Sequence, residues 1–383
     1  MLMNRRRMMY KIYEEAKEFA QEFIAPYAKK CDEEAIFPVE SFQKMGEKGY
    51  FNLLIPEQYG GLGKGLEEHS QVCMAFAEAS ATASLCYMMH NVGLHCVMTY
   101  GSDTLKEKIA KDVVENHKFF ALAYSEFETG THFIKSQLEV NHTKDGAIFN
   151  GSKSMVTSAT HASYYLIGAP AKKEGESNNW VVSLDTEGVT FKDSEWQGMG
   201  MRGNVSCPMI FTNAAIDHLY QVGAEGSGLE QVFHVITPFF VTGLASVYTG
   251  LCIQLSEEAV TYAKERVYPD GQALSDIETV QIHLSKIYTM ANAAKQTARD
   301  AAKAGANQEA DALLKILSAR IFASESAIEC SRLAMRVGGG KAYNKMGNFE
   351  RILRDSYASQ IMAPSVDVLI TWLGKSLVGL PIL

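Results

Sequence analysis

The sequence predicts an α+β chain in three parts: an N-terminal helical domain, a middle β-barrel domain and a C-terminal four-helix bundle. Apolar residues first recur at helical spacing, short strand-like runs separated by turn residues follow, and long helical segments return near residue 229. An order of helices, then strands, then helices is uncommon for a single chain. We place the three domains at residues 1–118, 119–225 and 226–383.

The first part is predicted to be helical from about residue 8. Ile12, Ala16 and Phe19 recur at the spacing of one helix face, and the Gly- and Pro-containing segment 55–63 interrupts the pattern as a loop. Two later segments are rich in Ala, Met and Cys, which indicates helices that are buried on several sides. These predicted helices span residues 65–81 and 84–100.

The sequence pattern changes from helical to strand-like at Phe119, where a short apolar run is followed by turn residues. Further short runs of strand-forming residues are separated by clusters of Gly, Asn, Asp and Lys. Strands of this length and spacing are typical of a small barrel or sandwich. The predicted strands lie within 119–124, 134–140, 147–150, 164–169, 180–184 and 209–212.

The last part is predicted to form a bundle of four long helices. Pro238 is expected either to kink the first of these helices or to mark its early turn, because proline lacks a backbone N–H. The predicted helices span residues 229–267, 274–304, 308–337 and 355–376.

Composition narrows the function classes. The formal net charge is −8 without a long basic run, which disfavours nucleic acid as a partner. Seven cysteines without a Cys-x-x-Cys pair favour reduced thiols and a cytoplasmic protein. The arginines at 5–7 precede no apolar signal-peptide segment, and we predict neither a membrane span nor a metal site.

Two signatures near the C-terminus point to a family. The chain reads Gly-Gly-Lys-Ala-Tyr at 339–343 and Glu-Arg-Ile-Leu-Arg-Asp at 350–355. Together with the Pro-Glu-Gln-Tyr-Gly-Gly-Leu-Gly segment at 56–63, these motifs resemble those of the acyl-CoA dehydrogenase family. The resemblance covers nearly the whole chain, and the family's fold has the same order of helical, β and helical parts. It implies a flavoprotein that binds FAD.

One residue departs sharply from this resemblance. Family members usually carry a catalytic Glu eight residues after the signature Asp355, and this chain has Ala363 there. Some members place the Glu on the first bundle helix instead, at a position that aligned on Pro238 is Ile236. The acid–base residue is therefore unknown. Weak candidates are Glu126, His90 and Asp367, followed by Glu128, His132, His234 and Tyr248, and for each a structural role is the stronger expectation.

The resemblance also implies a set of flavin contacts. The family's Thr-Glu-Pro loop corresponds to the segment from Ser125, and its Asn-Gly-x-Lys-x-Trp-Ile-Thr segment corresponds to 150–157, with Met155 in place of Trp. Arginines suit a diphosphate, and consecutive glycines permit close backbone approach. The predicted cofactor-binding residues are Tyr124, Ser125, Thr131, Met155, Thr157, Arg266, Arg336, Gly339, Gly340, Ser365 and Asp367. Such contacts cross between subunits in the family, which predicts a homodimer or homotetramer.

Three functions remain open at this point. The first is an FAD-dependent oxidoreductase acting on an acyl-CoA or carrier-bound thioester, as in fatty-acid metabolism, with an electron-transfer flavoprotein as a possible partner. The second is a flavin monooxygenase or desulfinase-like member of the same superfamily, because those reactions do not need the missing Glu. The third is a flavin-binding paralogue without catalysis.

Overall fold

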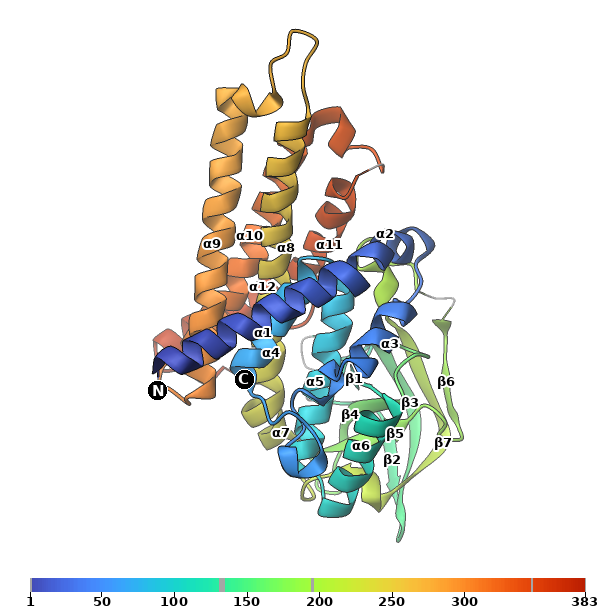
Figure 1. The fold of residues 1–383 in the computed structure, drawn as a ribbon. Coiled ribbons are helices and arrows are strands. Elements are labelled where there is room, and N and C mark those ends of the chain that lie inside the picture. Colours follow the sequence, from blue (N-terminus) through green and yellow to red (C-terminus); the bar gives the residue numbers. More distant parts are fainter. Residues whose placement is uncertain (1, 131–134, 194–195, 346, 383) are drawn as a thin grey trace.

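The computed structural model describes residues 2–130, 135–193, 196–345 and 347–382, with side chains of the first helix described from Lys11 onward. The chain forms three packed parts in the predicted order (Figure 1). The exact boundaries at 118/119 and 225/226 stay predictions.

The N-terminal part is helical, and two of its helices begin at serine caps. The hydroxyl of Ser80 accepts a hydrogen bond from the Ala83 N–H, and Ser102 does the same for Leu105. Every residue of the helix from Ala81 to Leu94 is buried, as its apolar composition predicts. The helices are α1 (Leu2–Phe23), α2 (Ala25–Glu34), α3 (Val39–Glu47), α4 (Leu66–Ala77), α5 (Ala81–Tyr100) and α6 (Asp103–Asn116).

The middle part contains two four-stranded sheets that pack against each other. One sheet has the order β1 (Phe120–Ala123), β4 (Tyr164–Pro170), β5 (Ser177–Ser183) and β8 (Gln221–Val222), with β1 and β4 parallel. The other has the order β2 (Glu139–His142), β3 (Gly146–Val156), β7 (Cys207–Asp217) and β6 (Val189–Phe191). Phe149 of β3 meets Trp180 of β5 edge to face with ring centroids 5.4 Å apart, so both sheets contribute to one core.

The strand predictions are confirmed for most runs and incomplete for others. Strands β6 and β8 were not predicted, because two or three residues give no periodic signal. The predicted run 134–140 was placed too early, since the strand begins at Glu139, and its first residue lies outside the described part of the chain.

The C-terminal part is a bundle of long helices. A short helix α7 (Gly228–Gln231) and a π-helical turn η6 (Val232–Ile236) lead into α8 (Thr237–Glu265), so Pro238 lies in the first turn of α8. The next helices are α9 (Glu278–Ala306) and α10 (Ala312–Ala342).

The prediction of one helix over 355–376 is wrong. The chain forms α11 (Phe349–Ile361), leaves helical geometry at Met362, and starts α12 (Val366–Leu377) after Ser365. Pro364 has no backbone N–H and disfavours helical geometry in the residue before it, which accounts for the break. The turn at 362–365 therefore carries Ala363 outside any helix.

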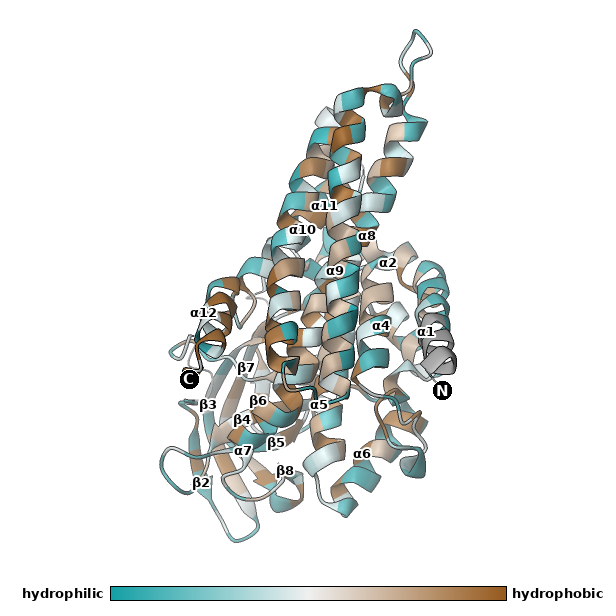
Figure 2. Cartoon of the chain, turned by 90° about the vertical axis from the view of Figure 1, so that its left-hand side faces the viewer, coloured by the Kyte–Doolittle hydropathy of each residue, from teal (hydrophilic) through white to brown (hydrophobic). Residues whose placement is uncertain are grey.

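One stretch, Gly228–Glu265, is long and apolar enough to cross a membrane by length and composition alone. Its most apolar window is 78% buried inside the protein, among the other helices of the bundle (Figure 2). Such burial is what the central helix of a folded bundle shows, so this stretch is weak evidence for a span.

Candidate functional site

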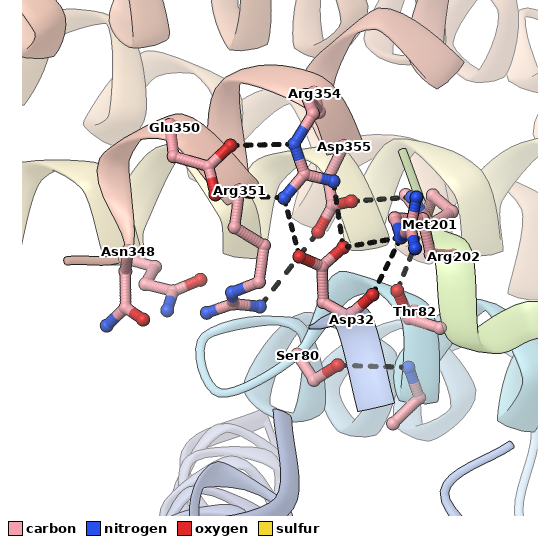
Figure 3. A network of polar contacts seen from close by, with 12 residues as sticks. Asp32, Ser80, Thr82, Met201, Arg202, Asn348, Glu350, Arg351, Arg354 and Asp355 are labelled. Atoms are coloured by element: carbon pink, nitrogen blue, oxygen red, sulfur yellow. Dashed lines mark hydrogen bonds and ion pairs between the residues drawn. The ribbon is translucent and has the colours of Figure 1, made fainter. Parts of the chain in front are cut away.

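The Glu-Arg-x-x-Arg-Asp signature forms a set of polar contacts that we call the clasp: Asp32, Arg202, Glu350, Arg354 and Asp355 (Figure 3). The Arg354 guanidinium donates to both Asp32 carboxylate oxygens, at 2.5 and 2.8 Å, and to Glu350 Oε2 at 2.8 Å. Arg202 Nε donates to the Asp32 carbonyl at 2.7 Å. The clasp thus joins α2, the loop before β7 and α11.

Asp355 also binds the loop before β7. Its carboxylate is buried and accepts a hydrogen bond from the Met201 backbone N–H at 2.5 Å. Burial raises the pKa of Asp355 to about 6, against the lowering effect of Arg351. The preceding Gly200 lies so close to the Arg354 carbonyl that a Cβ there would be 2.2 Å from the oxygen. These contacts assign the signature an architectural role.

A second buried pair anchors the loop that follows β1. Lys153 Nζ lies 2.5 Å from Glu126 Oε1 and donates to the Gly168 carbonyl at 2.6 Å, and both side chains are fully buried. The other Glu126 oxygen accepts from the Gln137 N–H at 2.6 Å. Burial lowers the pKa of Lys153, and Glu126 opposes that effect. Both oxygens of Glu126 are therefore engaged in structural contacts, which weakens it as a candidate base.

The predicted flavin face is assembled at the junction of this loop with β3. The Ser125 carbonyl accepts from the Ser154 N–H at 2.8 Å, so the loop lies beside the strand end that carries Met155. Met155 is 58% exposed, and the buried Thr157 hydroxyl lies 3.0 Å from the Ser206 hydroxyl. The Tyr124 hydroxyl donates to Asn179 Oδ1 at 2.6 Å and points into the protein. The predicted contact Thr131 lies outside the described residues.

A second group of predicted cofactor residues lies at the far end of the bundle. Arg266 ends α8, while Arg336, Gly339 and Gly340 lie near the end of α10. The two helix ends touch, because the Tyr262 hydroxyl donates to the Gly338 carbonyl at 3.4 Å. This end of the bundle stands away from the two sheets (Figure 1). One chain therefore presents the predicted cofactor residues as two separate groups.

Next to the turn lies a set of residues that we call the corner: the buried Tyr248 and Arg320, the partly buried Met362 and the exposed Ala363. The Arg320 guanidinium is fully buried, lies 4.7 Å from the Tyr248 ring centroid and donates to the Ser359 carbonyl at 3.1 Å. It also bonds the Ser324 hydroxyl, while its Nε has no hydrogen-bond partner. Within the described part of the chain, no carboxylate forms an ion pair with Arg320.

Tyr248 connects Arg320 to the turn. Its hydroxyl approaches the Met362 sulfur at 3.8 Å, next to Ala363. Burial raises the pKa of Tyr248 to about 12, against the lowering effect of Arg320. The nearby Ser365 caps α12 by accepting from the Val368 N–H, and the predicted contact Asp367 is exposed on the first turn of that helix.

The remaining acid–base candidates are placed as follows. His90 is fully buried with both ring nitrogens on the backbone, at 3.0 Å from the Phe51 carbonyl and 3.1 Å from the Phe120 N–H, and burial lowers its pKa to about 4. His234 is exposed beside Glu230, and Glu128 is exposed. His132 lies outside the described residues. His90 thus has the structural role that was the stronger expectation.

Sequence reasoning missed several residues that shape the site. Lys153, Asn179 and Ser206 hold the predicted flavin face in place, but their partners lie many residues away. The motif lysine at 153 was a signal for such a contact, whereas no sequence signal marked the other two. Among the described residues, no group of three or more His, Cys, Asp or Glu side chains could hold a metal ion.

Comparison with family models gives three matches along the chain. The model described as "Acyl-CoA dehydrogenase, N-terminal domain" matches residues 10–117. The middle-domain model of the same family matches residues 121–214, and the C-terminal-domain model matches residues 242–378. Together the three matches include most of the chain.

Similar curated proteins span nearly its whole length. An acyl-CoA dehydrogenase of Bacillus subtilis (strain 168) is 26% identical over 373 residues, covering 95% of this chain and 96% of the relative. A 3-(aryl)acrylate reductase of Clostridium sporogenes (strain ATCC 15579) is 28% identical, covering 89% and 90%. A solved glutaryl-CoA dehydrogenase in complex with glutaryl-CoA shares the fold, with a TM-score of 0.90 and 22% identity over 98% of this chain and 96% of that one.

Proposed function

Because the chain belongs to the acyl-CoA dehydrogenase family, we propose that it is an FAD-dependent oxidoreductase that acts on a carbon–carbon bond of an acyl thioester. The acyl group is carried by CoA or by a carrier protein. This proposal is supported by the intact clasp and by the anchored flavin-face loop. The predicted acid–base position is Ala363, in the turn after α11. The scaffold is retained, and the proton-handling group is not the usual Glu.

The chain's own residues fit a flavin dinucleotide. The buried Thr129 hydroxyl, in the loop after β1, has no hydrogen-bond partner, and Met155 offers an apolar exposed surface beside that loop. At the other end, Gly339 has a φ of +55° with open space where a Cβ would point, and Arg336 is exposed three residues before it. An open backbone flanked by a guanidinium suits a diphosphate.

In this proposal each group of residues has a distinct task. Ser125 and Thr157 hold the flavin ring by backbone and hydroxyl groups, while Arg266 and Arg336 hold the diphosphate. Bound FAD supplies two-electron redox chemistry by hydride transfer. The fully buried Glu126–Lys153 pair keeps the flavin-face loop in one position, which is the precondition for orienting a substrate.

The direction of reaction depends on which residue removes the proton from the α-carbon or donates it. Oxidation requires a base, and Ala363 cannot serve. Reduction requires a proton donor, which can stand elsewhere, and one curated relative is described as a reductase. Asp367, exposed in the first turn of α12 and four residues after Ala363, is the remaining carboxylate candidate near the turn, ahead of Glu126 and His90.

We further propose that the active form is a homodimer or homotetramer in the cytoplasm, with an electron-transfer flavoprotein as electron partner. Two observations support self-association. The two groups of predicted cofactor residues lie at different ends of one chain, so a shared site needs two copies. The turn, α12 and the C-terminal segment also carry large exposed apolar side chains: Ile361, Ile370, Leu377, Val378 and Leu380.

The decisive experiment is the absorption spectrum of the purified protein followed by anaerobic titration with a panel of acyl-CoA thioesters. A yellow protein that one thioester bleaches supports the oxidoreductase. A yellow protein that no thioester bleaches, but that consumes oxygen once its flavin is reduced, supports the monooxygenase instead. A colourless protein that cannot be reloaded with FAD contradicts both and leaves the non-catalytic paralogue.

Ala363→Glu tests the role of the turn. We expect the variant to bleach with a saturated acyl-CoA about 10²-fold faster than the unaltered protein, the lower end of what a positioned base contributes. Ala363→Gln is the control, because it has the same size and cannot accept the proton. Stopped-flow absorbance measures both rates, and equal rates for Glu and Gln would mean that position 363 does not face the α-carbon.

A further inference from the structure

A hollow of about 1010 Å³ lies where the N-terminal helices meet the base of the bundle. Its walls come from the loop before α4, the end of α5, the π-helical turn η6 and the start of α8, the connection between α9 and α10, and Trp372 of α12. Of the residues that the sequence assigned to cofactor or catalysis, the hollow includes His234 alone. Nothing in the proposed function assigns it a ligand.

The lining is mostly apolar and rich in rings. Phe239 and Ile316 are buried core residues that reach the hollow, and Trp372 closes it from α12. A volume of this size matches small-molecule sites, which are typically apolar with a few polar groups. The aromatic lining residues are Tyr100, Phe233, Phe239 and Trp372.

One polar atom of the lining, Nδ1 of His95, has no hydrogen-bond partner. His95 lies on α5 with its ring 4.2 Å from the Phe239 ring, and its Nδ1 is buried without a hydrogen-bond partner. Burial lowers the pKa of His95 to about 4, so the imidazole is neutral at physiological pH. His95 is partly exposed and lines the hollow, and a neutral imidazole there offers a ligand one hydrogen bond.

The wall next to His95 has an unusual backbone. Residues Val232–Ile236 form a π-helical turn, and three of them, Phe233, His234 and Val235, line the hollow. The Tyr100 hydroxyl lies 3.3 Å from His234 Nδ1 and ties this turn to α5. Single π-turns cost stability and occur frequently at functional sites. The turn is thus an independent indication that the wall is shaped for a ligand.

The charges around the hollow limit the ligand class. Lys64 is the one Lys or Arg in the described lining, which also includes two carboxylates, Glu67 and Glu68. A molecule with several phosphates would meet more negative than positive charge there. The lining therefore favours an uncharged ligand.

We propose that this hollow is a second small-molecule site, separate from the cofactor face, for an uncharged ligand with an apolar ring and one hydrogen-bonding group directed at His95. The rings of Phe239 and Trp372 enclose the apolar body. His95 supplies the single polar contact, and the π-helical turn provides the fitted wall.

Indole is a suitable probe, because it has an apolar ring and one N–H, and 1-methylindole is the same ring without that donor. Calorimetric titration of the FAD-loaded protein is expected to show one saturable indole site. His95→Phe should weaken indole about 10-fold, the equivalent of one hydrogen bond of about 1.4 kcal/mol. The same variant should leave 1-methylindole within twofold of its original affinity.

Two filling variants locate the site. Ala312→Phe and Ala306→Phe place a ring into the hollow from the α9–α10 connection and should abolish indole binding. Ala310→Phe is the matched control, because Ala310 is exposed between them and does not line the hollow. Unchanged flavin content and thermal midpoint establish that each variant is folded.

The proposal is overturned if indole does not saturate, or if neither filling variant reduces its binding. It is also overturned if octanoyl-CoA competes with indole and both filling variants block octanoyl-CoA, because the hollow would then be part of the thioester site. None of these readouts requires turnover, so they do not depend on whether the proposed oxidoreductase activity is found.

Discussion

The clasp and the corner each contain a largely buried arginine of the C-terminal bundle, and their surroundings are opposite. Arg354 of the clasp meets two carboxylates, Asp32 and Glu350, within 2.8 Å. Arg320 of the corner has hydroxyl, carbonyl and ring partners and no ion pair among the described residues. The segment 350–355, which supplies three residues of the clasp, keeps all the charges of the family signature, whereas the corner contains Ala363, at the position where the resemblance predicts a Glu.

The difference shows that the clasp stabilises the fold, whereas the turn with Ala363 is not needed for packing. The clasp holds α2, the loop before β7 and α11 together, so loss of any member would loosen three parts of the chain. Ala363 lies on an exposed turn, where a side chain can change without disturbing the packing. The fold can therefore be retained while the acid–base group changes.

The largest effect is expected from Arg354→Met. The exchange leaves Glu350 without a cation and Asp32 with the more distant Arg202 alone, at 4.0 Å. It should lower the unfolding free energy by about 3 kcal/mol, the lower end for a broken buried pair. Differential scanning calorimetry measures the fall in the thermal midpoint. Arg332→Met is the control, because Arg332 pairs with Glu329 on an exposed face of α10 and should change the midpoint little.

The second largest effect is expected for the pH dependence of the unfolding free energy, which the clasp residue Asp355 contributes. The pKa of Asp355 is raised to about 6 in the folded protein, so the folded state holds a proton that the unfolded state has already released between about pH 4 and 6. The stability contributed by Asp355 is thus present at low pH and lost as pH rises through about 6.

Asp355→Asn removes this titration while keeping an oxygen for the Met201 N–H. The difference in unfolding free energy, unaltered protein minus variant, should fall by about 2.7 kcal/mol between pH 4 and pH 7, from two pKa units at 1.36 kcal/mol each. Thermal midpoints at a series of pH values measure it. A difference that rises with pH would contradict the raised pKa.

The smallest effect is expected from Arg320→Met, the same exchange at the corner. It removes a fully buried guanidinium that leaves no unpaired carboxylate behind, so the unfolding free energy should be unchanged or increased. The midpoint of Arg320→Met should lie above that of Arg354→Met. A loss as large as that of Arg354→Met would show that Arg320 has an anionic partner, such as a bound cofactor.

The sequence by itself determined the three-part order, most of the helices and the family motifs, because periodicity, turn residues and fixed motif spacing are local properties. Motif spacing also gave the prediction that Ala363 takes the place of the family's usual Glu, which the Ala363→Glu variant tests. They did not locate the break at 362–365, which divides the predicted helix 355–376, although Pro364 is a local signal for a helix boundary.

Only the tertiary structure showed which charged residues stabilise the fold through buried contacts. Lys153 belongs to a recognised motif, but only the structure shows that it is fully buried against Glu126. Arg320 reads as an ordinary helix arginine, yet it is fully buried in the corner. The hollow beside His95 is likewise formed by segments from five places in the chain. Burial and pairing depend on contacts between residues far apart in sequence, and a local pattern does not contain that information.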